Sequence, residues 1–440
     1  MYPPEKLTYR RIFLFWGPLA LTWLMMAFEQ PFLIAFIARL GDAKYNLAAF
    51  GIAGSFAMII EAPIIMLMSA STALVTGRNS YRKLKKFTDI LNGGITAIQL
   101  IILLPPVFNF IVIQLMEVPR EVARLAHIAL LIFLPWAASI GYRRFYQGIL
   151  IRNNLTRRVT YGTVVRLAVI VIVGLILYAA GVKGAYVGAG AMSLAVLFEA
   201  VATRIMADRT LKTLLVTEDT ANGALRLRSI AKFYYPLALT SILSLGVHPF
   251  ITFFLGRSNM AVESLAVLPV VSALVFVSRT VGLSFQEFII ALIGEKKQNY
   301  TILRNSAIYL GIMVTLMISA IAFTPLADLW FINVSGLSDE LSAISYLPLK
   351  IMILLPAFTV LLNFQRACLI ANGTTGPISV ATAIELASII ALLLVCVVTL
   401  NLVGVIAASI AYVTGKGLSN LYLIPKQAAA VRAWRFNDQT

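Results

Sequence analysis

The sequence predicts an all-α polytopic membrane protein with twelve transmembrane helices, arranged as two six-helix lobes related by a parallel internal repeat. Three observations predict this fold class. Of the 440 residues, 60% are apolar and only 12% are charged, whereas soluble domains are about 45–50% apolar and about 25% charged. The chain divides into apolar runs that match the roughly 20 residues a membrane span requires. Its two halves also share a sequence pattern at a fixed offset.

The apolar runs end where charged residues or clusters of glycine, asparagine and proline interrupt them. The first six lie near residues 12–39, 46–76, 86–116, 122–146, 160–181 and 184–207. The other six lie near residues 230–256, 260–293, 301–332, 341–371, 376–399 and 402–425. Several runs are long and contain proline, which favours tilted or kinked helices that continue past the bilayer. The first run is too long for the apolar core of a signal peptide and is predicted to be a retained span.

The distribution of lysine and arginine predicts the orientation of the chain in the membrane. The net charge is +17, and the basic residues gather in the even-numbered loops and at both ends. Arg78 and Lys85, for example, follow the second run, and Arg143 and Arg144 stand at the end of the fourth, where we expect the next cytoplasmic loop to begin. Cytoplasmic loops carry such an excess and meet anionic headgroups of membrane lipids. We therefore expect a multi-pass protein of the plasma (inner) membrane with both termini cytoplasmic.

The internal repeat is detected when the sequence is aligned with itself without gaps, so that position 18 is paired with position 236. This shift aligns Pro-Leu-Ala-Leu-Thr at 18–22 with the same residues at 236–240, and Pro-Phe at 31–32 with Pro-Phe at 249–250. In the ungapped segment 15–48, 13 of 34 positions are identical. A shared apolar bias does not explain such a match, so we take the repeat as real.

The repeat also predicts the domain organisation. A unit with an even number of spans enters the membrane in the same direction in both halves, as in parallel-repeat transporters, whose substrate sites lie near the midplane between the halves. The predicted parts are an N-terminal six-helix lobe (1–207), a cytoplasmic linker (208–229), a C-terminal six-helix lobe (230–425) and a cytoplasmic tail (426–440).

Other classes of function are disfavoured by the motifs that the sequence lacks. No glycine-rich phosphate loop is present, because the segment 415–417 lacks the upstream glycine spacing and the hydroxyl residue of that motif. There is also no metalloprotease motif, nucleophile elbow or Cys/His cluster with zinc spacing. We expect no enzyme activity, no metal and no cofactor. The high apolar content argues against a nucleic-acid partner, although the chain is basic.

Ionisable residues within the predicted spans are the main functional candidates, because a charge at membrane depth is costly and usually faces a cavity or a partner. Glu29 lies two residues before Pro31, and Glu61 lies two residues before Pro63. We expect both carboxyl groups to bind a coupling ion, H⁺ or Na⁺. The alternative for Glu29 is an acid that only forms an interhelical hydrogen bond. Glu199 and Glu385 are weaker candidates, since a partner within a lobe would account for each.

Further candidates follow from the repeat. Glu61 aligns with Arg279 at the same offset, so the two either pair across the cleft in one state or each have a partner in their own lobe. His248 precedes Pro249 as Gln30 precedes Pro31. The predicted substrate-binding residues are Gln30, His248, Arg279, Gln286 and Glu287. The predicted hinges, where proline removes a backbone hydrogen bond, are Pro18, Pro31, Pro236 and Pro249.

Several short segments resemble the multidrug and toxic compound extrusion (MATE) transporters. Arg39-Leu40-Gly41 and the following Leu-Ala-Ala-Phe-Gly-Ile-Ala at 47–53 are similar to the end of their first helix and the start of their second. Gln147-Gly148 with Thr156 resembles the turn after their fourth helix, and residues 364–375 resemble its echo in the second half. The resemblance implies a twelve-helix, two-lobed antiporter of the multidrug/oligosaccharidyl-lipid/polysaccharide (MOP) exporter superfamily. Such a protein exports small organic compounds against a proton or sodium gradient, and we expect it to act as a monomer.

The resemblance leaves two substrate classes open. Many MATE proteins carry an aspartate in the first helix where this chain has Leu33, and the nearest acid here is Glu29. Residues 29–30 and 235–239 also resemble segments of the progressive ankylosis proteins, a related branch associated with export of citrate and pyrophosphate. The multidrug resemblance implies lipophilic cations as substrates. The alternative is a small organic anion, with Arg279 and His248 as its contacts.

Overall fold

The computed structural model describes residues 27–153, 155–219, 226–283, 299–372, 374 and 376–437, together with Ile12, Trp16, residues 23–25, Phe285, Ile289 and Ile293. These residues are almost entirely helical, with one isolated bridge between Asn259 and Val403 and no sheet among them. The all-α prediction is confirmed. Ten helical segments of the described chain are long and apolar enough to cross a membrane, and they coincide with predicted spans two to eleven. The first and twelfth predicted spans correspond to the shorter apolar helix Trp23–Ala38 and to α20 (Gly404–Asn437).

Contacts divide the chain into two compact units, which are described separately. The 36–257 unit also contains residues 261–266, and the 267–440 unit also contains residues 258–260 and the described residues up to Ala35.

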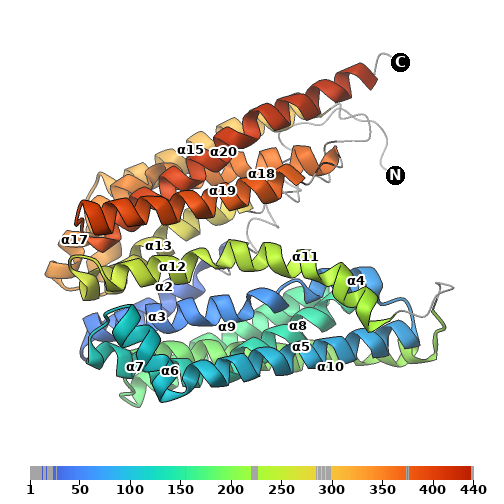
Figure 1. Ribbon diagram of the computed structural model, residues 1–440, viewed down its shortest axis with the longest axis horizontal. Helices are drawn as coiled ribbons and strands as arrows, with labels where there is room; N and C mark the ends of the chain where they lie inside the picture. Colours follow the sequence, from blue (N-terminus) through green and yellow to red (C-terminus); the bar gives the residue numbers. More distant parts are fainter. Residues whose placement is uncertain are drawn as a thin grey trace. The chain divides into compact units, whose positions relative to one another are not determined.

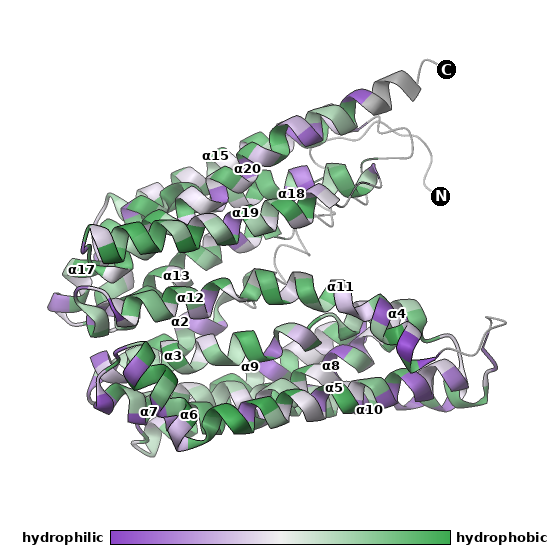
Figure 2. Ribbon diagram, viewed as in Figure 1, coloured by the Kyte–Doolittle hydropathy of each residue, from purple (hydrophilic) through white to green (hydrophobic). Residues whose placement is uncertain are grey.

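The 36–257 unit is a helical bundle. Its elements are α2 (Glu29–Ala38, shared with the other unit), α3 (Ala43–Glu61), η1 (Ala62–Ile64), α4 (Leu67–Leu74), α5 (Arg78–Leu103), α6 (Pro105–Asn109), η2 (Phe110–Leu115), α7 (Arg120–Ile132), α8 (Leu134–Arg152), α9 (Thr156–Ala179), α10 (Gly184–Val216), α11 (Leu227–Leu245) and α12 (Val247–Gly256). Helix α10 packs against α7, α8 and α9, and α4 packs against α8 (Figure 1). Apolar residues cover most of α9, while hydrophilic residues gather at the start of α5 and the end of α10 (Figure 2).

Helices α11 and α12 make their contacts with α3, η1 and α5 inside the 36–257 unit. The sequence assigned residues 230–256 to the C-terminal lobe. The lobe boundaries drawn from the repeat stay a prediction.

The 267–440 unit is a second bundle. Its elements are α13 (Ala261–Leu283, which begins in the other unit), α15 (Tyr300–Ala322), α16 (Leu326–Asp328), η3 (Leu329–Val334), α17 (Asp339–Ile351), η4 (Met352–Leu354), α18 (Leu355–Ala371), α19 (Gly376–Leu393), η5 (Leu394–Thr399) and α20. Helix α20 packs against α18 and α19, and α15 packs against α18. A core of buried apolar side chains that includes Phe285, Leu303 and Val360 joins α15 to α18.

The third predicted span is shorter than its apolar run. Residues 86–116 were expected to form one helix, but α5 ends at Leu103 and the chain turns at Leu104 before Pro105 and Pro106. A proline disfavours helical backbone in the residue before it, and Leu104 indeed leaves the helical region with φ −59° and ψ 127°. The remaining apolar residues form the short elements α6 and η2.

The internal repeat is visible in the backbone itself. Left-handed φ angles, which are unfavourable for residues other than glycine, occur at Asp42 and at Met260, which the repeat places in register with it. They occur again at Glu117 and Gly336, and at Gly181 and Asn401, two pairs that are related by nearly the same offset. The π-helical turns η2 and η3 are likewise repeat equivalents. The two halves therefore share their turns as well as their helices, and the predicted internal repeat is confirmed.

Candidate functional site

The predicted hinge prolines Pro31 and Pro249 lie beside breaks in their helices. A turn at Phe28 interrupts the helix before α2, and Gly246 separates α11 from α12. Each break precedes its proline by three residues, and the breaks are one repeat apart. Proline lacks an N–H and its ring crowds the carbonyl four residues earlier, which accounts for both breaks. Pro236 lies within α11.

Glu29 is the first residue of α2, directly after the break at Phe28, and is only 4% exposed. The unsatisfied N–H groups at a helix start favour a carboxylate there. Gln30 follows it and is half-buried. Glu29 therefore lies at a buried helix discontinuity, and its role in binding a coupling ion stays a prediction. Three other predicted site residues, Pro18, Gln286 and Glu287, lie outside the described residues.

Glu61 lies at a second discontinuity. It is the last residue of α3, it is 9% exposed, and the 3₁₀ turn η1 that follows contains Pro63. The indole Nε1–H of Trp136 donates a hydrogen bond to Glu61 Oε2 at 2.6 Å. The hydroxyl of Tyr234 donates to the carbonyl oxygen of Pro63 at 2.5 Å, which satisfies a backbone acceptor that the helix break leaves open.

A buried charge cluster lies near Glu61, and sequence reasoning named its acid, Glu199, but not its basic partners. Arg143 of α8 forms an ion pair with Glu199 of α10, with 2.5 Å between NH1 and Oε2, and Arg166 of α9 approaches the same oxygen to 3.9 Å. Gln147 Nε2 donates to Glu199 Oε1 at 3.3 Å. Arg143, Arg166 and also Arg144 interact electrostatically with Glu61.

The prediction that Arg143 and Arg144 lie in a cytoplasmic loop was wrong. Helix α8 continues to Arg152, and Arg143 is 5% exposed. Its burial is possible because Glu199, 1% exposed, supplies a counter-charge. The spacing of Arg143 and Gln147, one helical turn apart on one face of α8, is the sequence signal that could have indicated a buried partner.

The 267–440 unit contains a comparable cluster. Lys416 of α20 forms an ion pair with Glu385 of α19, and their side chains are 11% and 13% exposed. Arg279 and Arg366 also interact electrostatically with Glu385. Arg279 Nε donates to Thr359 Oγ1 at 3.0 Å, and Arg366 NH2 donates to Thr382 Oγ1 at 3.2 Å.

The two clusters occupy equivalent helices of the repeat with the charges rearranged. In the 36–257 unit, the fourth and fifth helices carry the bases Arg143 and Arg166 and the sixth carries the acid Glu199. In the 267–440 unit, the fifth helix carries the acid Glu385 and the sixth carries the base Lys416. In each unit, buried ion pairs therefore connect the last helices. The helices that carry the acid and the bases differ between the two units.

Glu61 and Arg279, aligned by the repeat, belong to different units and each has partners in its own unit. Their pairing across a cleft stays a prediction. His248 is half-buried in α12, and its carbonyl oxygen accepts a hydrogen bond from Thr252 Oγ1 at 3.0 Å. Among the described residues, no group of three or more His, Cys, Asp or Glu side chains could hold a metal ion.

Comparisons with known proteins agree with this architecture. Residues 18–177 match the MatE family model. The fold resembles an inward-facing multidrug resistance MATE family transporter of the MOP superfamily, with a TM-score of 0.70, 15% identity, and coverage of 93% of this chain and 96% of that one. It also resembles the lipid II flippase MurJ in an inward closed conformation (TM-score 0.71, 17% identity, coverage 94% and 87%).

A third similar structure is the Vibrio cholerae MATE transporter VcmN in its bent form, with a TM-score of 0.59, 17% identity, and coverage of 97% and 98%. No curated protein sequence matches the chain. Residues 18–177 therefore resemble the MatE family in sequence, and nearly the whole chain shares the multi-helix fold of the MATE transporter structures.

Proposed function

We propose that the protein is a secondary active exporter, which moves small organic compounds out of the cell by alternating access coupled to a proton or sodium gradient. The observation that carries this proposal is the buried Glu61 carboxylate at the break between α3 and η1. Broken membrane helices with ionisable groups at the break are typical ion and substrate sites in secondary transporters.

The coupling step follows from the contacts of Glu61. As a carboxylate it accepts the Trp136 hydrogen bond and attracts the nearby arginines. Neutralisation by H⁺ or Na⁺ weakens both interactions and so changes the balance between arrangements of α3 and η1. Glu29, which starts α2 after the break at Phe28, is the second ion-binding group. Similarity to transporters described as inward-facing and outward-facing supports alternation between two such states.

The proposed substrate is a lipophilic organic cation. This choice rests on analogy with a similar structure, which is described as a multidrug resistance transporter. We place both termini in the cytoplasm, from the positive loops, and take the protein to act as a monomer in the plasma membrane. Gln30, His248, Arg279, Gln286 and Glu287 stay the proposed substrate contacts, with Pro18, Pro31, Pro236 and Pro249 as hinges.

A second substrate class is favoured by the buried charges. Among the described residues of the 267–440 unit, the bases Arg279, Arg366 and Lys416 interact with the single acid Glu385. An excess of buried positive charge attracts anions, because the low dielectric strengthens the interaction. This observation favours a small organic anion such as citrate or pyrophosphate, with Arg279 and His248 as contacts.

Reconstitution into proteoliposomes tests both proposals. Uptake of a cationic dye should respond to an imposed pH or sodium gradient, and Glu61→Gln should abolish the response while the control Glu340→Gln, at an exposed position, retains it. Dye uptake that ignores both gradients would rule out coupled cation export. Binding of citrate or pyrophosphate that is lost in Arg279→Ala would support anion export instead.

A further inference from the structure

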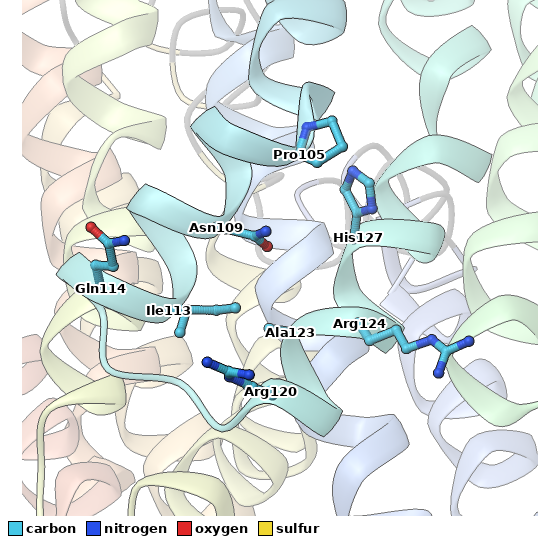
Figure 3. A pocket seen from close by; sticks show the side chains of 8 residues that line it. All are labelled: Pro105, Asn109, Ile113, Gln114, Arg120, Ala123, Arg124 and His127. Carbon is cyan, nitrogen blue, oxygen red and sulfur yellow. The ribbon is translucent and has the colours of Figure 1, made fainter.

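A pocket of about 500 Å³ lies where α5 ends, between α6 and η2 on one side and α7 on the other. Its polar lining consists of Asn109, Gln114, Arg120, Arg124 and His127 (Figure 3). A volume of this size is typical of small-molecule sites, which span about 300–1,000 Å³.

The lining is electropositive. It contains two guanidinium groups, and none of the described residues that line it is acidic. The nearest acids in sequence lie outside the lining, since Glu117 pairs with Arg257 at 2.9 Å and Glu121 is exposed in the first turn of α7. His127 is held in place because its Nε2–H donates to the carbonyl oxygen of Leu103 at 2.7 Å.

The N-terminus of α7 adds to the positive electrostatic potential of the pocket. Its N-cap residue is Pro119, which provides no side-chain cap. The N–H groups of a first helical turn carry partial positive charge and attract anions.

The repeat supplies an internal comparison. The equivalent pocket in the 267–440 unit lies between α16 and α17, and Asp328 and Tyr346 there are the repeat equivalents of Asn109 and His127. Tyr346 donates a hydrogen bond to Asp328 at 2.5 Å.

The N-termini of α7 and α17 also differ in charge and capping. Ser338 takes the place of Pro119 and caps α17, with its Oγ 3.4 Å from the backbone N of Leu341. Asp339 takes the place of Arg120. The pocket of the 267–440 unit is thus lined by one acid, Asp328, and one base, Lys350, beside a capped helix start, whereas the pocket of the 36–257 unit is lined by two arginines and no acid among its described residues. The excess of positive charge therefore comes from the side chains of the 36–257 unit and not from the shared backbone.

Apolar side chains stand beside the basic pocket. Leu104, Phe110 and Leu115, on the elements that form it, are 53%, 55% and 41% exposed. Exposed aromatic and aliphatic residues next to cations at the end of a membrane span suit a ligand that has both an anionic head and hydrocarbon chains.

We propose that this pocket binds the headgroup of an anionic phospholipid. Arg120 holds the phosphate, and Arg124, whose guanidinium group points away from Arg120 (Figure 3), adds positive charge. The amides of Asn109 and Gln114 bond to the phosphate or glycerol oxygens, and the acyl chains lie along Leu104, Phe110 and Leu115. Arginine suits this role because its planar fork matches phosphate oxygens. The site is independent of the transport cycle proposed above.

Native mass spectrometry of the purified full-length protein, titrated with phosphatidylglycerol or phosphatidylcholine, tests the proposal. The wild type should bind phosphatidylglycerol at least about tenfold more tightly, and the double variant Arg120→Gln/Arg124→Gln should lose about tenfold or more of that affinity, the effect of losing one charged hydrogen bond. The control Arg39→Gln/Lys183→Gln removes two exposed charges outside the lining and should bind like the wild type.

Two further variants distinguish a loss of lipid binding from misfolding of the protein. Arg120→Lys/Arg124→Lys keeps the charge and should keep most of the affinity. Asn109→Asp introduces the acid that the other unit carries and should weaken phosphatidylglycerol binding. Equal binding of the two lipids, unchanged binding by the glutamine double variant, or inorganic phosphate binding as tightly as phosphatidylglycerol would each overturn the proposed lipid site.

Discussion

Trp136 donates its indole N–H to Glu61 Oε2 across 2.6 Å, and so joins the start of α8 to the end of α3. A buried carboxylate requires such donors because desolvation is otherwise expensive. The same bond holds in place a side chain that we propose to change its charge during transport.

Trp136→Phe tests the strength of this bond. The change keeps most of the ring volume but removes the donor, and should lower stability by about 1–3 kcal/mol, the usual cost of leaving a buried polar partner unsatisfied. Thermal unfolding in detergent measures the loss. Trp330→Phe is the matched control, since Trp330 Nε1 is buried without a hydrogen-bond partner among the described residues. Equal losses in both variants would contradict a specific role for the Trp136 bond.

The Arg143–Glu199 pair should tolerate joint replacement better than the loss of one partner. Glu199→Ala leaves Arg143 and Arg166 buried without their shared acid, which should cost about 3–5 kcal/mol. Arg143→Met/Glu199→Leu should recover a large part of this loss. A double variant at least as unstable as Glu199→Ala would mean that the pair has a structural role beyond charge balance.

Asp219 should confer a pH-dependent stability. It lies beyond the end of α10, and its carboxylate accepts hydrogen bonds from the backbone N–H groups of Asn79 and Ser80 at the start of α5. Burial acts to raise the pKa of Asp219, but the hydrogen bonds from Ser80, Asn79 and Thr76 outweigh it and lower the pKa below its ordinary value of 3.8.

Because the folded-state pKa of Asp219 is lowered, its contribution is present above the unfolded-state pKa and disappears as the pH falls through the folded-state pKa. Asp219→Asn should therefore reduce the melting temperature at pH 7, and the gap to the wild type should close below about pH 4. Asp208→Asn, which removes only two surface ion pairs, with Arg204 and with Lys212, should have little effect. A gap for Asp219→Asn that is constant from pH 7 to pH 3 would refute this account.

Gly148 permits the close packing of α8 on α4. A Cβ atom there would lie 2.3 Å from the carbonyl oxygen of Met68 and 1.8 Å from Ser71 Oγ. Gly148→Ala should thus destabilise the protein by at least about 1–3 kcal/mol through overpacking. Gly93→Ala, in open space on α5, should instead stabilise it by up to about 1 kcal/mol through helix propensity. Thermal unfolding of both variants measures the difference, and a neutral Gly148→Ala would refute the packing argument.

Most of the fold was predictable, because composition and local pattern dominate it. Predicted spans two to eleven coincide with the helical segments able to cross a membrane. The sequence repeat that aligns Pro31 with Pro249 is also seen in the backbone, because Asp42 and Met260 both have left-handed φ angles. The shorter third span was missed because an apolar run does not by itself reveal that Pro105 and Pro106 end a helix.

The candidate site was predictable only in part. Glu61 could be chosen as a candidate from the sequence because an acid within an apolar run is unusual, and its role stays a prediction. Arg143 was misplaced, because positive charge near the end of a run is normally a loop signal.

The sequence by itself determined that this is a membrane protein with two repeated halves, since hydropathy, charge bias and repeat identity are properties of the chain read in order. Only the tertiary structure decided which buried charges meet. Arg143 and Glu199 are 56 residues apart in the chain, and no local pattern encodes the packing of α8 on α10. The energy of a buried ion depends on the few ångströms that separate it from its partner, and that distance exists only once the helices are packed.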